Sequence, residues 1–165
     1  MAITVSSPQL LTDNHDLSDF DCGEPLLNDW LKRRALANQA SGVSRTFVVV
    51  DNRLRVIGYY ALSAGAVAHR DSTGAVRRNM PDPIPVMVLA RLAVDRNAQG
   101  KQLGGALLKD AVSRTLAVSE NAGVRALLVH ALHEKAKAFY RHYGFEVSPI
   151  DPMTLMLRLH IANES

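Results

Sequence analysis

The chain has 165 residues, of which 47% are hydrophobic and 21% are charged. This length predicts a single domain over residues 1–165, and this composition excludes an intrinsically disordered chain. No apolar run reaches the ~18 residues that a membrane-spanning helix needs. The formal net charge of +3 is too small to indicate a nucleic-acid ligand by itself.

The cysteine content and the N-terminal residues 1–9 are used to predict the cellular compartment of the protein. Cys22 is the one cysteine, which excludes an internal disulfide and leaves no indication of an oxidising environment. Residues 1–9 lack the basic and then apolar segments of a secretory signal. We therefore expect a soluble cytoplasmic protein with no membrane partner.

The first half of the sequence predicts a helix followed by two strands. Leucines and a tryptophan recur at helical spacing over residues 24–40, with Pro25 in the first turn. Residues 46–50 are β-branched and aromatic, and residues 56–62 are their expected antiparallel partner. Over residues 69–85, prolines, a glycine and basic side chains interrupt any periodicity, which predicts an exposed irregular loop with a function.

The second half alternates strands with helices, which predicts helices packed on a mixed sheet. Residues 86–94 are almost continuously apolar, as in a central strand that is covered on both faces. An apolar stripe that begins at Leu103 predicts a helix that ends near residues 121–123. A second buried strand, a short helix and a final strand follow, at residues 126–129, 135–143 and 153–159.

A glycine-containing turn joins the central strand to the helix after it. The turn reads Gln99-Gly100-Lys101-Gln102-Leu103-Gly104-Gly105. Amide groups at a helix start attract anions, and glycine lets an oxyanion approach the main chain. The turn has neither the Gly-Lys-Ser/Thr of a Walker A loop nor the Gly-x-Gly-x-x-Gly of a dinucleotide fold. Spacing alone is consistent both with a phosphate-binding cradle and with a plain tight turn.

Two motifs make the sequence resemble the GNAT acetyltransferase superfamily. Its acetyl-CoA motif, Arg/Gln-x-x-Gly-x-Gly/Ala, is matched at Gln99 and Gly104, with Gln102 in place of the middle glycine. The downstream pattern Phe-Tyr-x-x-x-Gly-Phe is matched at Phe139, Tyr140, Gly144 and Phe145. The resemblance implies an α/β GNAT fold with a mixed central sheet of about six or seven strands, flanked by about four helices.

The same resemblance implies acetyl-CoA as co-substrate and assigns roles to both motifs. Tyr140 is expected to be the general acid that protonates the coenzyme A thiolate, because a phenol is protonated at neutral pH. The cofactor is expected to lie against the end of the central strand and the glycine turn, at Leu92, Ala93, Val94, Gln99, Gly100, Lys101, Gln102, Leu103, Gly104 and Gly105.

Longer segments look like the TacT-type acetyltransferase toxins of bacterial toxin–antitoxin pairs. These segments are Phe20-Asp21-Cys22-Gly23-Glu24-Pro25, Asp29-Trp30-Leu31 and Leu89-Ala90-Arg91-Leu92-Ala93-Val94-Asp95. The similarity implies acetylation of the amino group of aminoacyl-tRNA, which stops translation. It also implies a homodimer that is neutralised by a ribbon-helix-helix antitoxin.

Basic side chains are the candidates for contacts with tRNA phosphates. They are Lys32, Arg33, Arg34, Arg77, Arg78 and Arg91. Arg91 stands in an otherwise apolar strand, where its charge needs a partner or a cleft. A solvated charged face would show the same pattern as a tRNA-binding surface.

No metal site is predicted, because His130 and His133 have no third ligand nearby in the sequence. Two other functions are consistent with the sequence. One is a GNAT N-acetyltransferase that acts on a small amine or a protein N-terminus, although a small cationic acceptor calls for an acidic pocket and the charges near the motifs are mostly basic. The other is a CoA-binding module without catalytic activity.

Overall fold

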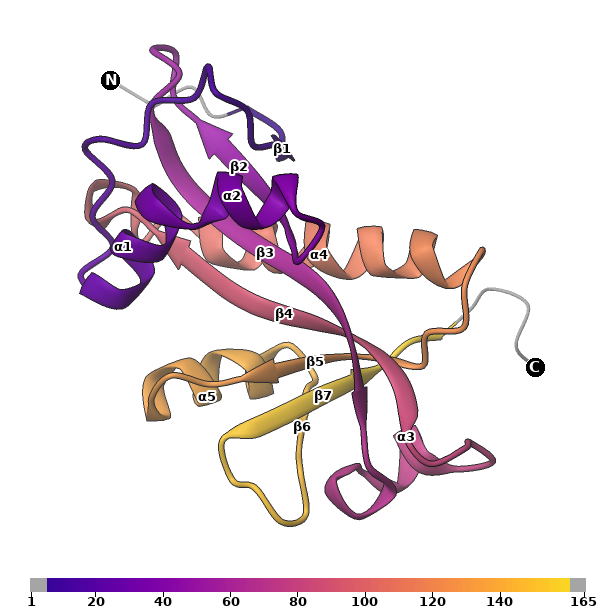
Figure 1. Ribbon diagram of the computed structural model, residues 1–165. Helices are drawn as coiled ribbons and strands as arrows, with labels where there is room; N and C mark the ends of the chain where they lie inside the picture. Colours follow the sequence, from indigo (N-terminus) through magenta and orange to yellow (C-terminus); the bar gives the residue numbers. More distant parts are fainter. Residues whose placement is uncertain (1–5, 161–165) are drawn as a thin grey trace. The chain divides into compact units, whose positions relative to one another are not determined.

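The computed structural model describes residues 6–160, in which it contains seven strands and five α-helices (Figure 1). The helices are α1 (Pro25–Arg33), α2 (Ala35–Ala40), α3 (Gly74–Arg77), α4 (Leu103–Ser119) and α5 (Glu134–His142). The strands are β1 (Gln9–Leu10), β2 (Arg45–Val50), β3 (Val56–Val67), β4 (Ile84–Val94), β5 (Ala126–His130), β6 (Glu146–Val147) and β7 (Thr154–Arg158). Two 3-10 turns are η1 (His69–Asp71) and η2 (Arg96–Ala98).

The strands form a mixed sheet in the order β1-β2-β3-β4-β5-β7-β6, which confirms the predicted α/β class. The chain divides into two compact units. Unit 1 comprises residues 6–63 and 90–111, and unit 2 comprises residues 64–89 and 112–160. Strands β3 and β4 and helix α4 contribute residues to both units.

Unit 1 is built on the antiparallel pair β2 and β3, against which α2 packs. Its core contains an aromatic cluster around Tyr59, whose ring stacks on Trp30 at 6.0 Å and meets the edge of Phe20 at 5.5 Å. The Tyr59 hydroxyl donates a hydrogen bond to the Leu27 carbonyl at 2.7 Å. These contacts hold α1 against β3, because Leu27 and Trp30 belong to α1.

The helix predicted over residues 24–40 is two helices. Arg34 separates α1 from α2 with φ −121° and ψ −30°, outside helical geometry. Leu31 in α1 and Ala35 in α2 are both buried in the unit 1 core. The local pattern contains no proline or glycine at residue 34, so it carries no signal for this break. The helical segment ends as predicted, with Gly42 at φ +81° after α2.

Unit 2 is built around β5, which pairs in parallel with β4 and antiparallel with β7. The described β4–β5 pairs run from Met87↔Leu127 to Leu89↔Val129. The core lies among buried side chains of the strands and α3, including Val76, Ile84, Leu128 and Met156. The short strand β6 pairs with β7 at the sheet edge.

The segment predicted as an irregular exposed loop, residues 69–85, is folded in unit 2. It contains η1, α3 and the first residues of β4, and Ser72 and Thr73 are buried. The His69 ring Nε2 lies 2.8 Å from the Met80 carbonyl oxygen, and the Ser148 hydroxyl donates to the Asp71 carbonyl at 2.6 Å. The expectation of irregular structure was wrong because these partners are distant in sequence and leave no local periodicity.

Gly58 sets the approach of α4 to β3 within unit 1. A Cβ placed on Gly58 would lie 3.0 Å from both Leu107 Cδ1 and Val49 Cγ2. Leu107 is fully buried, so its side chain has little room to move. Glycine at this position therefore lets α4, which begins directly after the glycine turn, pack closely on the sheet.

We predict that Gly58→Val lowers the free energy of unfolding by ~1–3 kcal/mol, because the added methyl groups overpack the core beneath α4. Urea denaturation followed by circular dichroism measures this loss. Gly123→Val is the matched control, since a Cβ there meets nothing within 4 Å. Equal urea midpoints for the two variants would show that the Gly58 contact does not constrain α4.

Candidate functional site

The carboxylate of Asp95 organises the start of the β4–α4 connection in unit 1. Asp95 is only 8% exposed, and its N–H donates to the Ile57 carbonyl at 2.9 Å. The carboxylate accepts hydrogen bonds from the N–H groups of Asn97 at 2.9 Å and Asp21 at 3.0 Å. These bonds fix the end of β4 relative to η2 and to the loop before α1.

Gln99, the first residue of the acetyl-CoA motif, uses its side chain to hold the same connection. The side-chain amide donates to the carbonyl of Val94 at 2.9 Å and to that of Cys22 at 3.1 Å. Gln99 therefore ties the glycine turn to the loop that precedes α1. The Gln99 side-chain amide is therefore engaged in holding the turn.

The loop before α1 is ordered by Asp21. Its carboxylate accepts hydrogen bonds from the Gly23 N–H at 2.9 Å and from the Asn28 side chain at 3.0 Å, and these bonds lower the pKa of Asp21. Arg96 lies 3.6 Å away in an exposed ion pair, which contributes little by itself. Cys22 packs against the unit 1 core, and burial raises the pKa of its thiol, which favours a packing role.

Two residues of the glycine turn have left-handed backbone, Gly100 at φ +81° and Gln102 at φ +62°. A Cβ on Gly100 would meet nothing within 4 Å, so the main chain is open on that side. Gln102 stands where the acetyl-CoA motif has its middle glycine. The positive φ at this position explains why the motif has glycine there, because glycine adopts left-handed backbone without a steric cost. An L-residue keeps this geometry at a cost of ~1–2 kcal/mol.

Helix α4 begins at Leu103, and Ala106 donates its N–H to the Gln102 carbonyl at 3.2 Å. The N–H groups of the first turn precede the intrahelical ladder, and the helix dipole makes this end favourable for an anion. Lys101 is exposed beside them and adds positive charge. These features are those that a diphosphate-binding turn requires.

Tyr140 lies on α5 in unit 2 and is 6% exposed. Its ring packs between Phe139 at 5.2 Å and Phe145 at 5.5 Å. This burial raises the pKa of the phenol, so the hydroxyl is protonated at neutral pH. Gly144 follows α5 at φ +92°, as predicted for a left-handed cap, and the downstream motif thus fixes the helix end beside Tyr140.

His133 begins α5 as its N-cap. Its ring Nδ1 accepts a hydrogen bond from the Ala136 N–H at 3.1 Å. His133 is therefore engaged in helix capping. Among residues 6–160, no group of three histidine, cysteine or acidic side chains could hold a metal ion.

The candidate tRNA contacts of unit 1 differ in their surroundings. Lys32 and Arg33 are exposed in the last turn of α1. Arg91 is partly buried on β4, and its guanidinium carbon lies 4.4 Å from the centre of the Trp30 ring. The sequence predicted that Arg91 needs a partner for its charge. That partner is the face of the Trp30 ring, which holds the guanidinium by a cation–π interaction.

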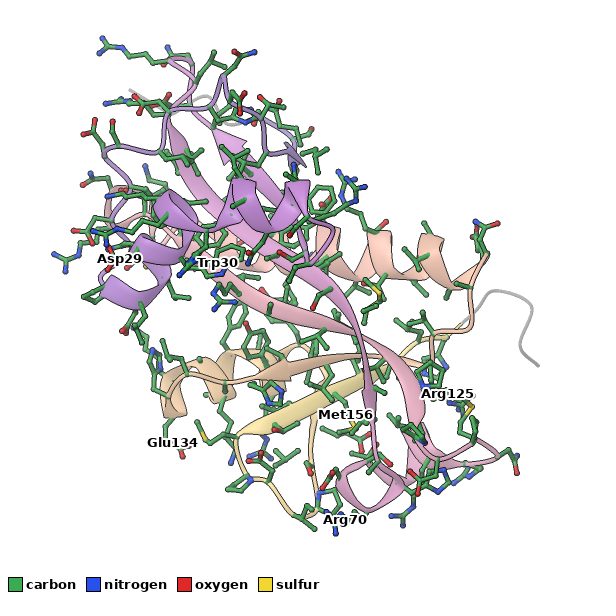
Figure 2. All side chains as sticks on the ribbon, viewed as in Figure 1. Asp29, Trp30, Arg70, Arg125, Glu134 and Met156 are labelled. Atoms are coloured by element: carbon green, nitrogen blue, oxygen red, sulfur yellow. The ribbon has the colours of Figure 1, made fainter. Side chains whose placement is uncertain are left out.

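The candidate tRNA contacts of unit 2, Arg77 and Arg78, lie together at the end of α3 and are exposed. The adjoining backbone is held by Arg125, which Figure 2 shows beside α3. Arg125 donates to the carbonyls of Val76 at 3.1 Å, Ala75 at 3.2 Å and Arg78 at 3.1 Å. Sequence reasoning missed Arg125, because a lone arginine before a strand carries no pattern.

Residues 43–147 match the acetyltransferase (GNAT) domain family. The chain belongs to the GNAT acetyltransferase family. Membership in this family confirms the predicted enzyme class, an acyltransferase that uses acetyl-CoA. Among the described residues of this GNAT protein, no helix has the length and apolar character required to cross a membrane.

Relatives of this GNAT chain include the tRNA-acetylating toxin of Mycobacterium tuberculosis, which is 54% identical over 152 residues, or 92% of this chain and 91% of the relative. A tyrosine-to-phenylalanine variant of KacT has a similar structure, with a TM-score of 0.86 and 28% identity over 96% of this chain and 95% of KacT. AtaT complexed with acetyl-methionyl-tRNAfMet superposes with a TM-score of 0.85 and 29% identity over 95% of both chains.

A tyrosine-to-phenylalanine variant of AtaT, bound to the C-terminus of the antitoxin AtaR and to acetyl-CoA, is also similar to this chain. Its TM-score is 0.78 and its identity is 30%, over 94% of this chain and 92% of AtaT. These similarities extend over nearly the whole GNAT chain and confirm its resemblance to the TacT-type toxins.

We predict that Gln102→Gly changes the free energy of unfolding by less than ~1 kcal/mol, because relief of the left-handed backbone offsets the greater flexibility of the unfolded glycine. The variant retains its main-chain N–H and should bind acetyl-CoA at least as tightly as the unaltered protein. Gly100→Val, at φ +81°, should lose more than ~1 kcal/mol. Urea denaturation and titration calorimetry measure both effects, and loss of acetyl-CoA binding by Gln102→Gly would contradict the main-chain cradle.

Proposed function

We propose that this chain is a toxin that moves the acetyl group of acetyl-CoA to the α-amino group of aminoacyl-tRNA and thereby blocks translation. The observation that carries the proposal is the 54% identity to a tRNA-acetylating toxin over 91% of that relative. The structure of AtaT with acetyl-methionyl-tRNAfMet supports an acetylated aminoacyl-tRNA as the product. We further propose that residues 1–165 act as one GNAT domain and that the protein works in the cytoplasm, where charged tRNA is found.

The main chain is proposed to hold the coenzyme. The N–H groups of the glycine turn, residues 99–105, bind its diphosphate, and the charge of Lys101 assists them. Main-chain N–H groups of Leu92, Ala93 and Val94, at the end of β4, contact the acyl end and polarise the thioester carbonyl. This assignment is supported by the left-handed turn at Gly100 and by the placement of these residues at the end of β4 and the start of α4.

Tyr140 is proposed to be the general acid. A free α-amino group has a pKa of roughly 8, and the ester of aminoacyl-tRNA lowers it, so the attacking amine is available without a strong base. When the carbon–sulfur bond breaks, Tyr140 gives its phenolic proton to the departing sulfur. The role requires a phenol that carries its proton at neutral pH, and buried Tyr140, whose pKa is raised by desolvation, meets this requirement. Tyrosine is also the residue replaced in the KacT and AtaT variants.

Five basic residues are proposed to contact the tRNA phosphates: the exposed Lys32, Arg33, Arg77 and Arg78, and the partly buried Arg91. Arginine and lysine neutralise phosphate charge, and fixed side chains lose less conformational entropy on binding. The Trp30 ring supports this role because it restricts where the Arg91 guanidinium can lie. Arg125 supports it because its hydrogen bonds hold the backbone that carries Arg77 and Arg78.

An antitoxin and a second copy of the chain are the proposed protein partners. The structure of AtaT with the C-terminus of AtaR supports neutralisation by an antitoxin. We propose that this antitoxin is of the ribbon-helix-helix type and that the toxin acts as a homodimer. Sedimentation of the purified protein and of its complex with a co-expressed antitoxin measures both assemblies.

We predict that Tyr140→Phe lowers acetyl transfer to charged tRNA by ~10²–10⁴-fold while acetyl-CoA still binds, because the variant loses only the acidic proton. Transfer is measured with labelled acetyl-CoA and total charged tRNA, and binding is measured by calorimetry. Tyr143→Phe is the matched control, since Tyr143 lies one residue beyond the same helix. Undiminished transfer by Tyr140→Phe would remove Tyr140 from the mechanism.

We predict that replacing Arg77 and Arg78 by glutamine makes tRNA binding less sensitive to salt. Each lost phosphate contact should reduce the slope of log K against log salt by ~0.7–0.9. Filter binding of charged tRNA at a series of salt concentrations measures the slope. Arg53→Gln, in the exposed β2–β3 turn, removes one positive charge as a control, and each of Arg77→Gln and Arg78→Gln alone is its charge-matched comparison. An unchanged slope for the double variant would place the tRNA elsewhere.

A further inference from the structure

A chain of hydrogen bonds links His130, Thr154 and Asp151 in unit 2. His130 is the last residue of β5 and pairs with Thr154, the first residue of β7. The His130 ring Nδ1 lies 2.8 Å from Thr154 Oγ1, and Thr154 Oγ1 lies 2.8 Å from Asp151 Oδ2. The other carboxylate oxygen of Asp151 accepts the Met153 N–H at 3.0 Å. Neither the family motifs nor the proposed function uses these three side chains.

The protons available on the three side chains determine which group donates in each of these hydrogen bonds. Hydrogen bonds from the Thr154 hydroxyl and the Met153 N–H, together with the nearby His130 ring, lower the pKa of Asp151, so its carboxylate is ionised and only accepts. The single hydroxyl proton of Thr154 goes to Asp151. Thr154 Oγ1 then accepts from His130, so the proton of the neutral ring lies on Nδ1. The lone pair of the ring is therefore on Nε2.

The position of His130 favours contact with a ligand. His130 is exposed, and it follows directly on Val129, which pairs with Leu89 of β4. Ligands of α/β sheets bind beyond the carboxyl ends of parallel strands, and His130 is the carboxyl end of β5. The backbone is held there, because the Ala131 N–H donates to the Met153 carbonyl at 2.7 Å. Helix α5, which carries Tyr140, begins at Glu134, four residues after His130.

We propose that His130 Nε2 is the general base of the acetyl transfer, with Thr154 and Asp151 as positioning residues. This inference rests on the proposed function. The amine nitrogen forms a bond to the thioester carbon and becomes positively charged, and His130 Nε2 removes one of its protons. The carbon–sulfur bond then breaks, and Tyr140 gives its proton to sulfur. A proton passes from His130 to solvent and one from solvent to Tyr140, which restores both groups.

Asp151 stabilises the positive charge that forms on His130 in this step. The imidazolium that forms on His130 carries a positive charge, and the Asp151 carboxylate lies one hydroxyl group away along the hydrogen-bonded chain. Thr154 holds the ring in the tautomer that leaves Nε2 free to accept. The arrangement uses a buried threonine, 5% exposed, as the link between carboxylate and imidazole.

Two substitutions of His130 test the proposal. His130→Asn keeps a donor near the Nδ1 position for Thr154 but has no basic nitrogen, and His130→Ala leaves space for a small molecule. We expect both to lower kcat/KM for charged tRNA by at least ~10²-fold while acetyl-CoA binding is unchanged. Added imidazole should restore activity to His130→Ala and leave His130→Asn unaffected. A purely structural role for His130 would not allow rescue by imidazole.

Controls separate positioning from chemistry. Thr154→Val removes the hydroxyl at nearly constant shape, and we expect a loss of ~10-fold or more in kcat with the KM for acetyl-CoA unchanged. His160→Asn, an exposed histidine beyond β7, should behave as the unaltered protein. Nitrogen NMR of the histidine rings in the unaltered protein should find the His130 proton on Nδ1. Near-normal activity of His130→Asn, or a proton found on Nε2 of the neutral ring, would overturn the proposal.

The outcomes also distinguish this inference from the proposed function. If the unaltered protein acetylates a small amine and not charged tRNA, the proposed acceptor is wrong. The same His130 variants are then measured with that amine, and a ~10²-fold loss with imidazole rescue supports the base. Full activity of His130→Asn toward an acceptor that the unaltered protein does acetylate overturns the base and leaves the proposed function intact.

Discussion

The carboxylate of Asp95 is the point at which three separate segments of unit 1 meet. It accepts hydrogen bonds from the main chain of residues 21 and 97, and its own N–H reaches the carbonyl of residue 57. A buried carboxylate is costly unless donors satisfy it, so these N–H groups must stay in place whenever the unit is folded. The start of the glycine turn is thereby fixed before any ligand arrives. For the diphosphate binding that we propose, a turn fixed in this way would lose little conformational entropy.

The groups to which we assign roles differ in kind between the two units. Those of unit 1 are main-chain N–H groups, a helix start and Lys101, all of which favour negative charge. Those of unit 2 are Tyr140, the proposed proton donor, and His130 with its hydrogen-bonded partners. The environments suit these tasks. Tyr140 is buried among aromatic rings, and its phenol is protonated at neutral pH. His130 is exposed, and its ring Nδ1 is hydrogen-bonded to Thr154.

Arginine is used in two ways that its sequence position does not reveal. Arg91 is placed by an aromatic face, and Arg125 holds three carbonyl groups at the end of α3. The planar guanidinium suits both arrangements, because it stacks on a ring and donates several hydrogen bonds in one plane. Of the arginines in unit 2, Arg125 orders the backbone at the end of α3, whereas Arg77 and Arg78, which we propose as tRNA contacts, are exposed there.

Local sequence was enough to predict most of the elements and both family motifs. The strands β2, β3 and β4 follow from nearly continuous apolar or β-branched runs, as expected where both faces of a sheet are covered. The helix α4 follows from its apolar stripe, since burial of one face imposes a helical repeat. Glycine and tyrosine spacing identified the turn and Tyr140 as candidates. The break at Arg34, the folded segment 69–85 and the side-chain role of Gln99 depended on packing. So did the chain from His130 to Thr154, because its members are 24 residues apart and only strand pairing brings them together.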